Sequence, residues 1–108
     1  MYEKKIKTQK NEVLEYELQI LSDSTFTFHF FRNLGKSISK DENVYGKGTW
    51  KVVKNVIHFV TNTNHLDEKY TLNFTNSSGR FDGKNKNQFR FYHSEIPWIE
   101  KLMLQKVE

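Results

Sequence analysis

The chain holds four histidines, whose imidazole groups can bind metal ions or transfer protons. His29 and His58 fall on the polar faces of two expected strands, and they would come close only if those strands were neighbours. A protein metal site normally needs three or four ligands at compatible spacing. His65 and His93 add no local pair, and no carboxylate cluster accompanies them. We therefore expect surface histidines, with no metal and no other cofactor.

Nucleophilic catalysis has little support in the sequence. It needs an activated Ser or Cys with a base held close to it. Cysteine is absent, no Gly-x-Ser-x-Gly turn occurs, and the acidic pairs Asp41–Glu42 and Asp67–Glu68 lie in expected loops. Carboxylates used as acid and base must reach a common substrate, and acidic residues spread along loops are a weak case for that. The sequence therefore predicts a protein that is not an enzyme.

Two segments are similar to motifs that bind phosphate or nucleic acid. Residues 46–49 (Gly-Lys-Gly-Thr) look like a truncated phosphate loop, but they lead into a strand, whereas that mechanism needs a helix N-terminus. We expect them to be a flexible entry into the next strand. Residues 88–93 interleave aromatics with a cation, as single-strand-binding β surfaces do. Their two phenylalanines share a face and are expected in the core, so Arg90 and Tyr92 should either face outward or line the open side of the barrel.

Composition favours a single domain over residues 1–108 that is built from β-strands. The chain has nine Phe, five Tyr and two Trp but no Ala, so it is rich in residues that suit strands and lacks the best helix former. The net charge is +4 and the sequence pI about 9.3. Lysines scattered along the chain are typical of a solvated surface with guarded strand edges, and nucleic acid or anionic lipid is the other interpretation.

Alternation of apolar and polar residues marks the strands. It has a period of two around residues 14–20, 25–30, 50–53, 57–59, 70–74 and 89–92, with polar turns at 22–24, 54–55 and 76–79. Residues 32–46 break the pattern and are predicted to form a long loop. Residues 98–107 fit either a helix or a strand; we favour a strand, which would pair with the first one and help to close the sheet.

Seven or eight short strands joined by neighbour turns predict an all-β, antiparallel up-and-down barrel. An eight-stranded barrel is either filled by side chains or holds one small ligand. The large aromatic rings could fill the interior completely, so a filled core and a ligand cavity both remain open. The residues expected to point inward are Phe26, Phe28, Phe30, Trp50, Val52, Ile57, Phe59, Tyr70, Leu72, Phe74, Phe89 and Phe91.

If a pocket exists, its mouth should lie between the 32–46 loop and the 76–87 turns. The polar contacts expected at this mouth are Arg32, Tyr45 and Arg80. Together with the inward-pointing Trp50 and Tyr70, they are the residues proposed to bind a ligand.

Residues 16–28 and 46–59, with their Gly46-x-Gly48-Thr49-Trp50 core, resemble the small lipocalin-like β-barrel proteins of bacteria. The resemblance covers about residues 14–75. It implies a barrel and an extracytoplasmic home, since such proteins are commonly secreted or lipid-anchored. We expect a periplasmic or cell-surface location if a signal peptide has been removed, and a cytoplasmic one otherwise. No apolar run approaches the ~18 residues of a membrane span.

The prediction is therefore a non-catalytic extracytoplasmic binding module for a small apolar or amphipathic ligand. One alternative is a basic nucleic-acid-binding β-barrel. Another is an interaction subunit that pairs with a protein partner through an exposed strand edge.

Overall fold

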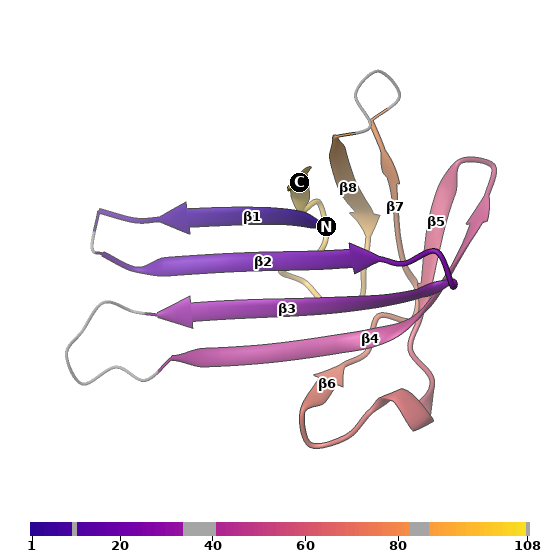
Figure 1. Cartoon of the computed structure of the whole chain (residues 1–108), viewed down its shortest axis with the longest axis horizontal. Coiled ribbons are helices and arrows are strands. Elements are labelled where there is room, and N and C mark those ends of the chain that lie inside the picture. The colour runs from indigo at the N-terminus through magenta and orange to yellow at the C-terminus, as the bar shows by residue number, and fades with distance from the viewer. Residues whose placement is uncertain (10, 34–40, 83–86, 108) are drawn as a thin grey trace.

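A computed structural model describes residues 1–9, 11–33, 41–82 and 87–107 (Figure 1). These residues form nine strands and one turn of 3₁₀ helix. The elements are β1 (Tyr2–Lys7), β2 (Val13–Ile20), β3 (Thr25–Asn33), β4 (Glu42–Val53), β5 (Val56–Val60), η1 (Thr63–His65), β6 (Tyr70–Leu72), β7 (Ser77–Phe81), β8 (Gln88–His93) and β9 (Met103–Lys106).

Eight of the strands close into an antiparallel barrel. β1, β2, β3, β4, β5, β7, β8 and β9 follow one another around the ring in chain order, and β9 returns to pair with β1. In Figure 1 the long strands β1–β4 lie side by side, and β5, β7 and β8 run across their direction. The short strand β6 lies outside the ring and pairs in parallel with β4. The predicted all-β meander barrel is confirmed.

The C-terminal segment forms a strand, as predicted, although it starts late. Residues 96–102 make two successive turns, in which the N–H of Ile99 bonds the carbonyl of Ile96 and the N–H of Leu102 bonds that of Ile99. β9 begins only at Met103. The helical spacing seen in the sequence therefore comes from the turns at residues 96–102, and the apolar–polar alternation comes from β9.

The core consists mainly of phenylalanine rings on the inner faces of the strands. Phe26 contacts Phe59 and Phe74 edge-to-face, with ring centroids 4.8 and 5.2 Å apart. Phe91 packs on Phe59 at 5.4 Å and on Phe89 at 5.1 Å. These five rings are buried, and Leu18 and Leu104 are buried with them. Of the two alternatives for the interior, the described residues support the filled one.

Val52 was predicted to point inward, and this is wrong. Its side chain is 54% exposed. The pairing of β3 with β4 ends at Thr49, so Val52 lies beyond the last neighbour on that side and no layer covers it. Trp50 and Phe30 are only partly buried, and they pack against the edge of the core.

The predicted loop over residues 32–46 is wrong at both of its ends. β3 continues to Asn33 and β4 starts at Glu42, so residues 32–33 and 42–46 are strand; residues 34–40 lie outside the described residues. Polar pairs support the extension, because Arg32 forms an ion pair with Glu42 and the amide of Asn33 bonds Asp41 at 2.6 Å. Alternation of apolar residues cannot reveal a strand held by polar pairs.

The predicted turn at residues 76–79 is shorter than expected. Asn76 carries the turn with a positive φ of 67°, and β7 begins at the next residue, Ser77. Ser77 and Gly79 are buried on the inner face of this strand. Small residues there leave room for the neighbouring rings. Because Ser and Gly are also common in turns, the sequence predicted a turn where this strand begins.

Two glycines of β4 let the core rings approach its backbone. A Cβ at Gly48 would lie 2.1 Å from the carbonyl oxygen of Val60, and one at Gly46 would lie 2.6 Å from the ring of Phe74. Neither distance is physically possible without a shift of the barrel. Residues 46–49 are therefore a close-packed part of the wall, and not the flexible entry predicted from the sequence.

Gly48→Ala should destabilise the protein by about 1–3 kcal/mol, because the added methyl group would push β4 away from the backbone of β5. Urea unfolding followed by tryptophan fluorescence measures this change. Lys51→Ala, at an exposed position of the same strand, is the matched control and should change the free energy of unfolding by less than about 0.5 kcal/mol. Equal stability of Gly48→Ala and the wild type would contradict the packing described above.

Candidate functional site

The five residues predicted to bind a ligand do not form one site. Arg32 is engaged by Glu42 at one end of the β3–β4 pair. The indole N–H of Trp50 donates to the carbonyl of Leu21 at 2.9 Å, at the other end of that pair. Arg80 lies on the outer face of β7. The structure does not bring these three side chains together, because they belong to different faces and ends of the barrel.

Tyr45 and Tyr70, the remaining two, do lie together, on the outer face of β4 and β6, so the prediction that Tyr70 points into the barrel is wrong. Their ring centroids are 5.9 Å apart, and His29 stacks on Tyr45 at 4.5 Å with nearly parallel planes. Lys47 lies 4.3 Å from the ring of Tyr70 and Lys69 lies 4.8 Å from that of Tyr45. Because cation–π contacts already cover these rings, we assign them the role of holding β6 against β4.

The turn before β6 is held by Asp67. Its Oδ1 accepts hydrogen bonds from the backbone N–H of Tyr70 at 2.7 Å and from that of Lys69 at 2.8 Å. These bonds, led by the one from Tyr70, hold the pKa of the Asp67 carboxyl below its ordinary value of 3.8. The carboxylate thus fixes the position of Tyr70 next to Tyr45.

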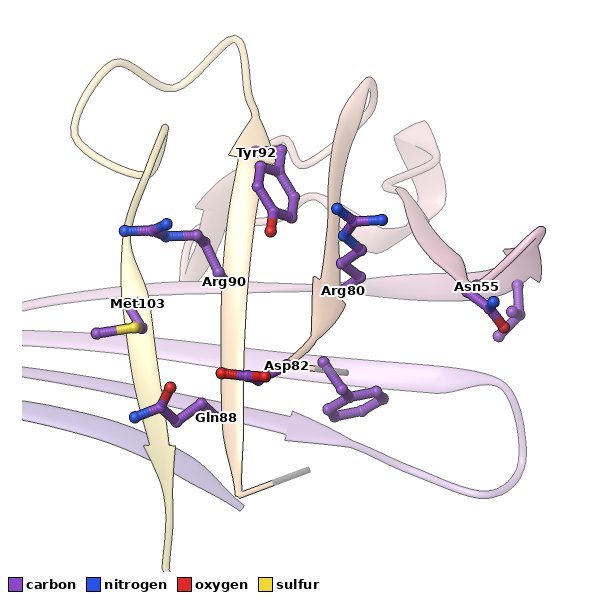
Figure 2. A pocket seen from close by; sticks show the side chains of 9 residues that line it. Asn55, Arg80, Asp82, Gln88, Arg90, Tyr92 and Met103 are labelled. Carbon is purple, nitrogen blue, oxygen red and sulfur yellow. The ribbon is translucent and has the colours of Figure 1, made fainter. Parts of the chain in front are cut away.

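A hollow of about 720 Å³ lies on the outer face of β7, β8 and β9 (Figure 2). Arg80 of β7 is directly opposite Arg90 of β8, and Met103 of β9 is directly opposite Arg90 on the other side. The β4–β5 hairpin forms one border. The complete lining is Val52, Asn55, Arg80, Phe81, Asp82, Gln88, Arg90, Tyr92 and Met103.

The two arginines carry no ion pair with any carboxylate of the described residues. Arg80 lies over the ring of Tyr92, with its guanidinium carbon 5.0 Å from the ring centroid. In Figure 2 Arg90 turns the other way, toward β9. Like charges directly opposite each other destabilise a sheet, so this pair is an unfavourable arrangement for the barrel alone.

Tyr92 reaches this surface because of a β-bulge. Gly79 pairs with Phe91 but Ser78 pairs with His93, so Tyr92 is the extra residue of β8. A bulge breaks the alternation of side chains, and both Tyr92 and His93 are exposed. Tyr92 is 48% exposed, which leaves much of its ring open to a ligand.

A second hollow of about 600 Å³ adjoins the bulge. A row of side chains crosses it from β4 to β8: Lys51 is opposite His58, His58 is opposite Ser78, and Ser78 is opposite His93. Glu95 also lines it, and its carboxylate accepts a hydrogen bond from the amide of Asn76 at 2.9 Å. His29, by contrast, lies on β3 beyond β4, so it does not neighbour His58.

Two features are absent from the described part of the chain: grouped metal ligands and helices that could span a membrane. Within residues 1–9, 11–33, 41–82 and 87–107, no three His, Cys, Asp or Glu side chains are grouped so as to hold a metal ion. The same ranges contain no helix that is both long and apolar enough to cross a bilayer.

Comparison with known proteins identifies no relative: neither the protein-family models, nor the curated proteins, nor the solved structures include a match to this chain. The resemblance to lipocalin-like proteins therefore stays a prediction.

Sequence reasoning identified the residues of the outer face but not their arrangement. It correctly placed Phe89 and Phe91 in the core and hence Arg90 and Tyr92 outside. It did not detect that Arg80 faces Arg90, because cross-strand register depends on turns and bulges that alternation does not encode. The bulge itself has no sequence signal here.

Arg90→Gln should raise the free energy of unfolding by about 0.2–1 kcal/mol, because it removes one of two like charges that face each other across β7 and β8. Urea unfolding at low salt measures the gain, which should shrink as salt screens the charges. Lys7→Gln makes the same change in net charge opposite Val13 and should give no gain. A destabilised Arg90→Gln variant would show that the arginine pair stabilises the barrel.

Asp67→Asn should make stability less sensitive to acid. Because the folded-state pKa of Asp67 lies below the unfolded one, its contribution is fully present above about pH 3.8 and is lost as pH falls through the folded-state value. We expect the wild type to lose more stability than Asp67→Asn between about pH 6 and pH 2.5, measured by urea unfolding. Identical losses would contradict the assigned hydrogen bonds.

Proposed function

We propose that this protein is a non-catalytic binding module that holds an organic anion on the outer face of β7, β8 and β9. One observation carries the proposal: Arg80 and Arg90 occupy directly opposite positions of β7 and β8 and line one hollow, without a carboxylate partner among the described residues. An anionic ligand would relieve their repulsion, and guanidinium groups bind phosphate and carboxylate through paired hydrogen bonds.

The other groups of the hollow suit a ligand with a flat ring. Tyr92 offers an exposed aromatic face, and Met103 offers a polarizable apolar side chain that is 37% exposed. The amides of Asn55 and Gln88 add hydrogen-bond donors and acceptors. Such groups bind and orient a molecule, and we infer no reaction from them.

A ligand inside the barrel is the less favoured alternative. The rings of Phe26, Phe59 and Phe74 already contact one another in the interior. A small apolar ligand would have to displace them. We retain the extracytoplasmic location and the likeness to lipocalin-like proteins as proposals that rest on the sequence resemblance alone.

Partner binding through a strand edge is also less favoured. The strands of the barrel form a closed ring, and in the described pairings the part of β1 beyond Glu3 is joined to β2 alone. That part carries Lys4, Lys5 and Lys7. Lysines on an open edge discourage pairing with another strand.

Titration calorimetry with thymidine 5′-monophosphate at low salt tests the proposal. The nucleotide should bind, and Arg80→Gln and Arg90→Gln should each weaken its affinity about tenfold, the effect expected for loss of a charged hydrogen bond. Lys7→Gln, with the same change in net charge, should bind like the wild type. Inorganic phosphate should bind more weakly, since it offers no ring to Tyr92.

Two results would count against this site: no heat of binding for either anion, or affinities that fall equally in Lys7→Gln and in the arginine variants. Melting curves of each variant confirm that it is folded.

A further inference from the structure

We propose that the anion is a single-stranded nucleic acid that crosses the outer face of the barrel from the first hollow into the second. This inference rests on the proposed function, and it adds the class of ligand and the path that the ligand follows.

Cations continue from one hollow into the next. The first hollow supplies Arg80 and Arg90, and the second supplies Lys51. The row from Lys51 to His93 spans four adjacent strands, which is about 14 Å at the ordinary spacing of about 4.8 Å between strands. A mononucleotide can reach only the two arginines of the first hollow, whereas a backbone with several phosphates also reaches Lys51.

The bulge joins the two hollows into one surface. Without it, strict alternation would direct Tyr92 outward and His93 inward. With it, Tyr92 lines the first hollow and His93 lines the second, on consecutive residues. A nucleic acid that stacks on Tyr92 in the first hollow can therefore continue to His93 in the second.

An exposed tyrosine next to arginines is typical of surfaces that bind single-stranded nucleic acid. Bases stack on aromatic side chains without regard to sequence while cations follow the backbone. The ring of Tyr92 is held from one side by Arg80, at 5.0 Å. Its open surface is left for a base, and the net charge of +4 favours a polyanion over a neutral ligand.

The position of the second hollow defines the direction of the path. His93 lines that hollow and follows Tyr92 directly in β8, so we expect the phosphates to follow β8 from Arg90 toward His93. In the second hollow Glu95 is held by the amide of Asn76, so we place the backbone on the side of Lys51.

Fluorescence anisotropy with a labelled oligonucleotide of 15 thymidines, over a series of salt concentrations, tests this inference. The logarithm of the binding constant should fall linearly with the logarithm of the salt concentration. Each of Arg80→Gln, Arg90→Gln and Lys51→Gln should reduce the magnitude of that slope by about 0.7. Tyr92→Leu should weaken binding about tenfold and leave the slope unchanged, because stacking releases no counterions.

Two comparisons test the path of the nucleic acid and the specificity of its binding: oligonucleotides of two lengths, and two double variants. Lys51→Gln should weaken the 15-mer but not a thymidine dinucleotide, which is too short to leave the first hollow. The double variant Lys5→Gln/Lys7→Gln removes two charges from β1 and should have less effect on the 15-mer than Arg80→Gln/Arg90→Gln.

The inference is overturned, and the proposed function survives, if thymidine monophosphate binds through the arginines but the 15-mer binds no tighter. It is also overturned if the Lys5/Lys7 variant loses as much affinity as the arginine variant, or if vesicles of phosphatidylserine compete for the arginines more strongly than the oligonucleotide. If neither the nucleotide nor the 15-mer binds, the inference and the proposed function fail together.

Discussion

The barrel depends on the close contact between two glycines of β4 and the rings beneath them. Because Gly46 and Gly48 present no Cβ to the interior, Phe74 and Phe26 occupy space that a methyl group would need. Those two rings then pack edge-to-face on each other, an arrangement that adds to the gain from burial. Protein interiors tolerate few voids, so the eight strands can close because the glycines let the rings fill the centre.

Because the described rings pack the interior, the binding that we propose lies on the outer surface, where Arg80 and Arg90 are directly opposite in the sheet. A barrel whose rings are buried can accommodate such a repulsive pair, whose cost is smaller than the gain from one buried ring. The same reasoning assigns Tyr45 and Tyr70 a structural role, since Lys47 and Lys69 already cover their rings. An aromatic residue on the surface indicates a site only where its face remains open.

Alternation of residues was sufficient to predict the barrel and the inward direction of Phe89 and Phe91, because one buried face imposes a period of two. It failed for Val52, which keeps the pattern but extends beyond the neighbouring strand. It also failed for the ends of β3 and β4, where polar pairs replace apolar ones. The candidate site depends on register between strands, which no local pattern in β7 or β8 encodes.

The register of that site is fixed by a buried pair of hydroxyl groups. Ser77 and Ser94 lie on the inner face, with their Oγ atoms 2.7 Å apart, and Ser94 also accepts the N–H of Ile96 at 3.1 Å. Hydroxyl groups buried without a partner are costly, so both serines must face inward together. With Phe91 also inside, only a bulge can accommodate Tyr92 and His93 between them. A hydrogen bond within the core thus sets which side chains the outer face presents to a ligand.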